Sequence, residues 1–209
     1  KQTAKSLPFG QLIEFLRKTN LVFPVIHGQF GEDGGIQKFL ADNRLPFIGS
    51  PAGACALAFD KFLANEFIKH HGFYAWPSLL LLKNQLGQHQ WQLAKFFKKY
   101  KIKRAVVKPA GGGSSLAVYA VDEIEQVLKA SRQIFSEDID QRVVVEPFCL
   151  GKEFTVIILE NKANQPVAIL PTEIQISHRQ IFDYRKKYLA TNQVCYHCPP
   201  RFSDKIILE

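Results

Sequence analysis

At 209 residues with 46% hydrophobic side chains, the chain can bury a sizeable core and is too apolar for a disordered segment. Its formal net charge of +8 suits an anionic partner, which can be nucleic acid, nucleotide or an acidic surface. It has no apolar run of the roughly 18 residues that a membrane span needs, no signal-peptide pattern at its start, and only four cysteines. A soluble cytoplasmic protein without a disulfide framework is therefore expected.

The N-terminal part, residues 1–77, predicts an incomplete doubly wound α/β domain. A helix at about 10–19 precedes LVFPVIHG (21–28), an apolar run typical of a buried parallel strand that delivers a loop at its carboxyl end. Loops at that end of a parallel sheet bind ligands. A second loop and helix follow, then a short strand at PFIGS (46–50) and one longer helix at 53–72.

After the WPSL turn the pattern changes to an α+β arrangement with hairpins. Helices are predicted near 91–99 and 122–135. Strands are predicted near 79–83, 105–109, 115–120, 143–147, 153–160 and 166–174. We divide this part into a central domain, 78–148, and the start of a third, 149–209.

Two basic runs with interleaved aromatic residues, KFFKKYKIKR (95–104) and YRKKY (184–188), leave two interpretations open. They can form a nucleic-acid-binding patch. In and beside the first run, however, apolar side chains follow helical spacing at Leu93, Phe96, Phe97 and Tyr100. This spacing is typical of the buried face of a helix with solvated lysines opposite, so no nucleic-acid partner is expected.

The stretch VVKPAGGGSSLAVYAV (106–121) places three glycines and two serines between two predicted strands. It is neither a Walker loop nor a dinucleotide fingerprint. Such a loop can fold over a polyphosphate, with backbone N–H groups and the hydroxyls of Ser114 and Ser115 as donors. Lys108, just before it, offers a positive charge for a phosphate. The alternative is a mobile hairpin tip with an exposed lysine.

In VVVEPFCLGKEFTV (143–156), Glu146 ends one predicted strand and Glu153 starts the next. The short apolar connector between them can hold a flat base by its backbone, while one carboxylate accepts from an amino group and the other from sugar hydroxyls. The alternative is that each glutamate is a solvated strand end. The glycine loop and the lysines at 61 and 108 favour a nucleotide site.

Five motifs in their order and spacing resemble the D-alanine–D-alanine ligases of the ATP-grasp superfamily. They are HGQFGEDGGIQ (27–37), FDK (59–61), VVKPAGGGSS (106–115), VEPFCLGKEFTV (145–156) and IFDYRKKYL (181–189). The resemblance covers residues 20–200. It implies ATP-dependent joining of two D-alanines through an acyl phosphate, for peptidoglycan synthesis, by a cytoplasmic enzyme that is commonly a homodimer.

The same resemblance implies a role for each matching residue. His27 and Glu32 match the first D-alanine site. Ser114 matches a loop donor that braces the substrate pocket, and Tyr188 matches a tyrosine of the loop over the second site, hydrogen-bonded toward Ser114. The ATP-binding positions are Lys61, Lys108, Ser115, Glu146, Phe148, Cys149, Glu153 and Lys187.

Some family features have no counterpart in this sequence. The first strand and a glutamate-bearing glycine loop are expected before Lys1, and an arginine and the ligands of two magnesium ions beyond Glu209. We therefore expect a partial doubly wound domain followed by an ATP-grasp fold without its C-terminal part, no metal ligand in this chain, and no activity of these 209 residues alone. Three smaller departures are Lys38 where a small residue usually follows IQ, Ala117 in place of a glycine, and Pro147 in the base-binding connector.

Three alternatives remain open. CYHC (195–198) has the Cys-x-x-Cys spacing of redox and zinc sites, but it has no second pair and is followed by two prolines, which favours a strand leading into a surface loop. The chain can bind nucleotide without completing a ligation. A ligase of this kind can also use D-lactate or D-serine as its second substrate, which the FDYRKKY motif disfavours.

Overall fold

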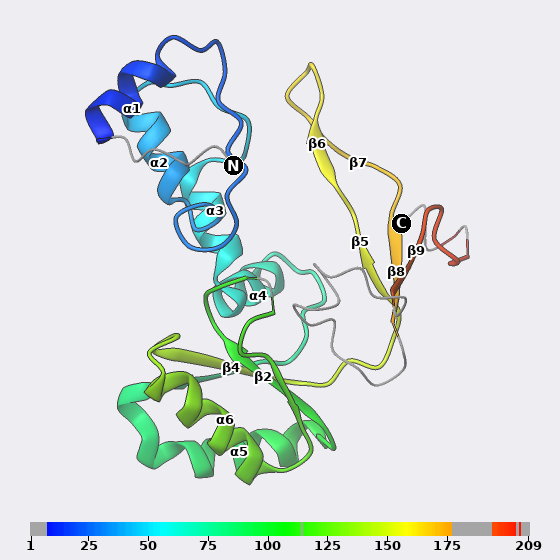
Figure 1. The fold of residues 1–209 in the computed structure, drawn as a ribbon. Helices are drawn as coiled ribbons and strands as arrows, with labels where there is room; N and C mark the ends of the chain where they lie inside the picture. Colours follow the sequence, from blue (N-terminus) through cyan, green and yellow to red (C-terminus); the bar gives the residue numbers. More distant parts are fainter. Residues whose placement is uncertain (1–7, 114, 177–193, 204, 206–209) are drawn as a thin grey trace. The chain divides into compact units, whose positions relative to one another are not determined.

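The computed structural model describes residues 8–113, 115–176, 194–203 and 205 (Figure 1). The chain divides into two compact units, Lys1–Pro147 and Phe148–Glu209. The domain limits of 77 and 148 drawn from the sequence stay predictions. Among the described helices, none has both the length and the apolar character that a bilayer crossing requires.

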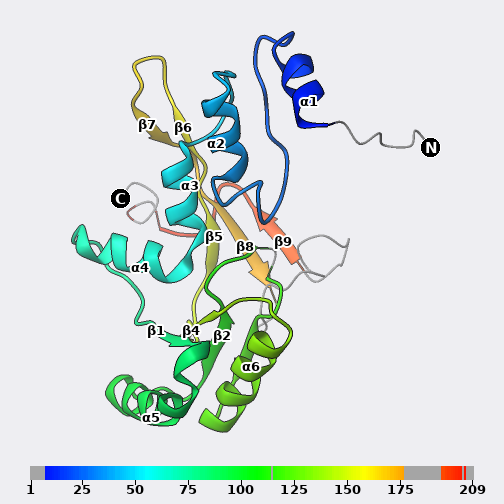
Figure 2. The ribbon, with the colours of Figure 1, turned by 90° about the vertical axis from the view of Figure 1, so that its left-hand side faces the viewer.

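The N-terminal part of the first unit is helical. It contains α1 (Phe9–Leu16), α2 (Gly35–Asp42), α3 (Ala52–Phe59) and α4 (Lys61–His70). Helices α2 and α3 lie side by side, as Figures 1 and 2 both show. Gly34, which precedes α2, has φ +93°, and a Cβ there would collide with the Ala52 carbonyl. This glycine therefore permits the two helices to approach.

The predicted strands at 21–28 and 46–50 are wrong in extent. Between these two described segments, the structure contains only an isolated parallel bridge that joins Val22 and Phe47. Pro24 has no N–H to donate to a neighbouring strand, and Phe23 and Val25 are 68% and 73% exposed. An apolar run without a covered face does not form a strand in this part of the structure.

The single helix predicted at 53–72 is also wrong, because Asp60 divides it into α3 and α4. Asp60 has an extended conformation, with φ −86° and ψ 107°, and its Oδ1 accepts hydrogen bonds from the backbone N–H of Phe62 and Leu63. Its Oδ2 accepts from Arg142. This capping starts a new helix, so Lys61 lies at the first position of α4.

A four-stranded antiparallel sheet forms the rest of the first unit. Its strands are β1 (Leu79–Leu82), β2 (Ala105–Pro109), β3 (Tyr119–Val121) and β4 (Arg142–Pro147), in the order β1-β4-β2-β3. The 3₁₀ helix η1 (Lys83–Gln88) leads into α5 (His89–Tyr100), and α6 (Ile124–Ser136) follows β3. The positions of these strands and helices confirm the predicted α+β pattern. Two elements start later than predicted: β3 at Tyr119 rather than near 115, and α6 at Ile124 rather than near 122.

Alternating side chains give this sheet two different faces. On β2, Ala105 and Val107 are fully buried against α5 and α6, and on β4 so are Val143 and Val145. Since neighbouring strand residues point to opposite faces, Lys108 and Glu146 lie on the face opposite these helices. The period of two thus separates the core from the candidate site.

Helix α5 settles the interpretation of the first basic run. Leu93 is fully buried and Phe96 is 7% exposed in the core, while the Tyr100 ring packs on Phe96 with centroids 5.1 Å apart. Lys98 and Lys99 are exposed. The helical interpretation is confirmed.

The second unit contains two small antiparallel sheets. Strands β5 (Glu153–Thr155), β8 (Thr172–Ile176) and β9 (Val194–His197) form one, in the order β5-β8-β9, and β6 (Ile158–Glu160) pairs with β7 (Pro166–Ala168) in the other. Three of the CYHC residues lie in β9, and both cysteines are exposed and free. The predicted strand leading into a surface loop is confirmed.

A buried carboxylate should make the second unit sensitive to acid. Glu173 is 2% exposed, and the hydrogen bonds of the Arg201 guanidinium lower its pKa from 4.5 to about 2; the Arg201 backbone N–H and Lys152 add to this, and burial opposes it. A depressed carboxyl pKa stabilises the fold above pH 4.5, and the stabilisation is lost as the pH falls toward 2. Thermal unfolding of Glu173→Gln should therefore depend less on pH between 5 and 2 than that of the parent.

The matched control is Glu160→Gln, which changes an exposed glutamate of β6. It should follow the parent over the whole pH range. If Glu173→Gln also followed the parent, the Arg201 contact would not stabilise this unit.

Candidate active site

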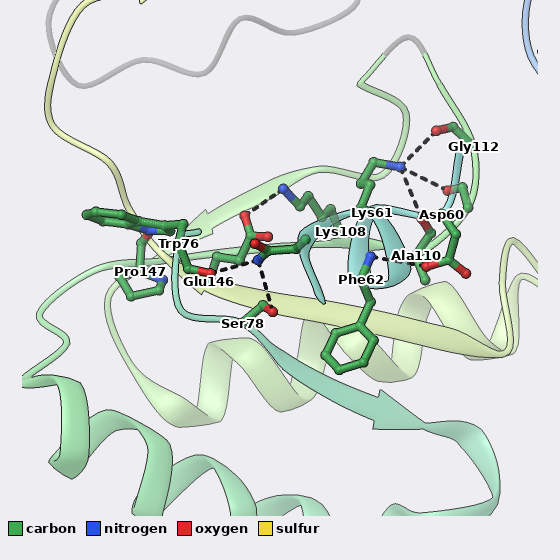
Figure 3. A network of polar contacts seen from close by, with 12 residues as sticks. Asp60, Lys61, Phe62, Trp76, Ser78, Lys108, Ala110, Gly112, Glu146 and Pro147 are labelled. Carbon is green, nitrogen blue, oxygen red and sulfur yellow. Dashed lines mark hydrogen bonds and ion pairs between the residues drawn. The ribbon is translucent and has the colours of Figure 1, made fainter. Parts of the chain in front are cut away.

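An ion pair on the face of the sheet opposite α5 and α6 joins two of the predicted site residues. Lys108 Nζ donates to Glu146 Oε2 over 2.6 Å, and the two side chains are 21% and 15% exposed (Figure 3). In the β2–β4 register, Lys108 lies opposite Val144 and Glu146 opposite Val106, so the pair is diagonal. Long side chains reach across this diagonal. The sequence-predicted lysine and glutamate therefore lie together.

Lys61 contacts the glycine loop from the start of α4. Its Nζ donates to the carbonyls of Ala110, Gly111 and Gly112 over 3.5, 3.2 and 2.8 Å (Figure 3). Burial lowers the pKa of Lys61, and the nearby Lys108 lowers it further, against the opposing effect of surrounding carboxylates. Two lysines thus lie close to one glycine loop. Their positive charges are what binding of a polyphosphate requires.

Acidic side chains hold the start of the loop, and the sequence analysis missed them. Asp140 accepts from the backbone N–H of Gly111 over 2.7 Å and from that of Arg142 over 2.9 Å. Arg142 in turn pairs with Asp60 beside Lys61. The one sequence signal was Asp60, since aspartate directly before a helical segment is a favoured cap.

The loop uses backbone conformations that most residues avoid. Gly112 has φ +90°, and Ser115 and Ala117 have φ +54° and +52°. In this left-handed region glycine carries no steric cost, whereas alanine does. The family's glycine at the position of Ala117 therefore suits the conformation that the chain adopts there.

His27 and Glu32 lie together in the same unit. Glu32 Oε2 accepts from the backbone N–H of Gly28 over 2.6 Å, and Glu32 Oε1 lies 3.5 Å from His27 Nδ1. A Cβ placed on Gly113 would lie 3.2 Å from Glu32 Oε2. The tip of the glycine loop therefore reaches the residues predicted for the first D-alanine.

A pocket of about 400 Å³ opens beside these two residues. Besides His27 and Glu32, its lining residues are Phe23, Pro24, Val25, Ile26, Gly31, Gln37, Ser50, Ala54, Cys55 and Ala58. Cys55 donates to the Ser50 carbonyl over 3.4 Å, and burial raises its pKa. A thiol in this state is a poor nucleophile at neutral pH, so the pocket is suited to binding rather than to covalent catalysis.

The other predicted site residues lie in the second unit, in the turn after the glycine loop, or outside the described residues. Phe148, half-buried, and Cys149, exposed, start the second unit, and Glu153 starts β5 there. Ser115 lies in the turn after the glycine loop. Ser114, Lys187 and Tyr188 lie outside the described residues. The site roles of all these residues stay predictions.

The described part of the chain contains no group of three or more His, Cys, Asp or Glu side chains arranged to bind a metal ion. The prediction that the magnesium ligands follow Glu209 stays a prediction.

Family models match most of the chain. The model for the D-ala D-ala ligase N-terminus matches residues 1–50, and the model for the D-ala D-ala ligase C-terminus matches residues 67–208. Curated D-alanine–D-alanine ligases from Finegoldia magna and Methylacidiphilum infernorum are each 34% identical to the chain. The matches cover 84% and 89% of this chain but 49% and 54% of those proteins, so the chain spans about half the length of the curated relatives it matches.

Solved structures agree with the sequence matches. The D-alanine–D-alanine ligase from Coxiella burnetii is 28% identical, with a TM-score of 0.67 over 75% of this chain and 44% of that chain. The D-Ala:D-Ser ligase VanG from Enterococcus faecalis is 25% identical, with a TM-score of 0.75 over 91% and 53%. This likeness confirms the predicted ATP-grasp fold over about half of the reference chains. With its family models and its relatives, the chain belongs to the D-alanine–D-alanine ligase family.

Proposed function

We propose that this protein joins two D-alanines at the expense of ATP. In the first step, the carboxylate of one D-alanine attacks the γ-phosphorus of ATP, giving an acyl phosphate and ADP. The amine of the second D-alanine then attacks the acyl carbon, phosphate leaves, and the amine loses a proton. The product is D-alanyl-D-alanine.

The observation that carries this proposal is the approach of Gly113 to Glu32. A Cβ at Gly113 would lie 3.2 Å from the Glu32 carboxylate, so the loop suited to phosphates ends beside the pocket suited to an amino acid. Acyl phosphate formation requires this proximity of phosphoryl group and carboxylate. A protein that only bound nucleotide would have no need of the second pocket.

Each part of the cluster has a role in this reaction. Lys61 and Lys108 bind the phosphates and offset their charge, and the N–H groups of the glycine loop add hydrogen bonds. Glu146 accepts from the amino group of the base, and His27 and Glu32 orient the first D-alanine. Phosphoryl transfer depends on such positioning and charge more than on a protein nucleophile.

The proposal extends to the wider setting of a family member. Magnesium accompanies ATP, Phe148, Cys149 and Glu153 hold the nucleotide, and Ser114, Ser115, Lys187 and Tyr188 act in the loops that cover the substrates. The enzyme is a cytoplasmic homodimer, and its dipeptide enters peptidoglycan synthesis. These statements rest on family membership.

The direct test is phosphate release from ATP and magnesium by the natural full-length protein. Release should depend on D-alanine, with D-alanyl-D-alanine identified by mass spectrometry. L-alanine is the matched control and should give only background release. Tight ATP binding without D-alanine-dependent release would favour the alternative of a nucleotide-binding protein without ligase activity.

A second candidate substrate is supported by the likeness to VanG, a D-Ala:D-Ser ligase. Offering D-serine or D-lactate together with D-alanine distinguishes the possibilities, because the mixed products differ in mass. We expect D-alanyl-D-alanine to dominate, in agreement with the FDYRKKY motif.

A further inference from the structure

Trp76 contacts the end of β4 through its side chain. Its indole Nε1–H donates to the backbone carbonyl of Pro147 over 2.7 Å, across 71 residues of sequence (Figure 3). The indole N–H is a donor only, so this contact has one direction. A partly exposed tryptophan, 36% exposed, is thereby fixed at the residue that follows Glu146.

The carbonyl that Trp76 contacts is the only backbone hydrogen-bonding group of its residue. Proline has no N–H, so Pro147 can serve a ligand by its carbonyl alone. A carbonyl oxygen has two lone pairs. The indole N–H occupies one lone pair and leaves the second for another donor. The same contact restricts the direction in which this second lone pair points.

A second acceptor comes one residue earlier. Glu146 holds its carboxylate against Lys108 at 2.6 Å and is 15% exposed. The pair fixes one oxygen, Oε2, and leaves acceptor capacity on the carboxylate. Two adjacent residues of β4 therefore offer acceptors, each restrained by a donor from elsewhere in the fold.

The position of Trp76 is itself fixed from α4. Asn65 Nδ2 donates to the Trp76 carbonyl over 2.7 Å and to Ser78 Oγ over 3.1 Å. Asn65 lies one helical turn after Lys61, which contacts the glycine loop. One helix thus connects to both the loop and the end of β4.

We propose that Trp76 is a positioning residue that selects a base with an exocyclic amine, by directing the Pro147 carbonyl alongside the Glu146 carboxylate. This inference rests on the proposed nucleotide site. The 6-amino group of adenine has two hydrogens and satisfies two acceptors. The 6-oxo group of hypoxanthine is itself an acceptor and would face them without a hydrogen bond, a mismatch that disfavours binding.

The test compares ATP with inosine triphosphate on the natural full-length protein by calorimetry. Trp76→Phe keeps an aromatic ring and removes the N–H. One neutral hydrogen bond corresponds to a change of about threefold to tenfold, so the preference for ATP should fall by this factor, mainly through weaker ATP binding. Trp91→Phe is the matched control, since Trp91 is 67% exposed on α5, and should leave the preference unchanged.

A spectroscopic measurement on the parent serves if Trp76→Phe does not fold. The Trp76 indole N–H resonance, identified by its nuclear Overhauser contact to Pro147, should shift when ATP is added and shift less with inosine triphosphate. Two results would overturn this inference and leave the proposed function intact. One is an unchanged preference for ATP in a folded Trp76→Phe protein. The other is ATP binding by the parent without a shift of this resonance. Failure of the parent to bind ATP would overturn the proposed function as well.

Discussion

Replacing Lys108 by alanine should remove most of the ATP affinity of the protein. Lys108 is 21% exposed and directly paired with Glu146, close to the glycine loop. A charge-assisted contact is worth about 1.5–3 kcal/mol, which corresponds to about a tenfold to hundredfold loss of affinity. The variant also leaves the Glu146 carboxylate without its cation, so the base end of the site is disturbed together with the phosphate end.

Calorimetric titration with ATP measures this loss. Lys98→Ala, which removes an exposed lysine from α5, changes the net charge equally and should bind ATP like the parent. The parent should also prefer ATP to a single-stranded oligonucleotide of similar charge. Equal ATP affinity in Lys108→Ala and the parent would refute the nucleotide site on this face.

Replacing Asp60 by alanine should cause the largest loss of stability among single changes near the site. The variant loses the cap of α4, worth about 1 kcal/mol, and leaves Arg142 without its partner. Since Arg142 is 38% exposed, solvent screens that pair and its contribution is nearer to 1 kcal/mol. The sum of about 2 kcal/mol corresponds to a fall in Tm of about 4–8 °C for a chain of this size.

Two further variants separate the two contributions. Asp60→Asn keeps a good cap and loses the charge, so it should fall about halfway between parent and Asp60→Ala. Asp42→Ala removes an exposed ion pair with Lys38 and should leave Tm within about 2 °C of the parent. If Asp60→Ala had the same Tm as Asp42→Ala, the break between α3 and α4 would not depend on Asp60.

The sheet of the first unit was largely predictable because its signal is local. Runs such as VVVEP alternate with turns and amphipathic helices, and burial in β2 follows the period of two, whereas Val143, Val144 and Val145 of β4 are all buried. The prediction of a strand at 21–28 was wrong because an apolar run forms a strand only where neighbouring strands pair with it and pack against it. The prediction of one helix at 53–72 was wrong because the alanine-rich helical pattern continues past Asp60 in the sequence. A single aspartate that can cap a helix is a weaker signal than this pattern.

The candidate site was predictable only for residues with a chemical signature. The glycine loop pointed to Lys108, a charged strand end pointed to Glu146, and the family resemblance pointed to Lys61 and Glu32. The structure brings these four residues into the first unit. Trp76, Asn65 and Asp140 were missed because each acts by a side-chain hydrogen bond to a backbone atom far away in sequence. Such bonds leave no periodicity and no motif.

The break at Asp60 also bears on how this family can diverge. In a continuous helix, one inserted residue would rotate everything beyond it by about 100°, and Lys61 and Asn65 would leave their partners. Because α4 begins anew at its own cap, an insertion in α3 should change only the pocket side chains that α3 carries. The wall of the pocket beside His27 and Glu32 can therefore vary in length and register while Lys61 keeps its contacts with the glycine loop. Evolution or protein engineering can thus alter the substrate preference of the proposed ligase at α3 without changing the proposed ATP site.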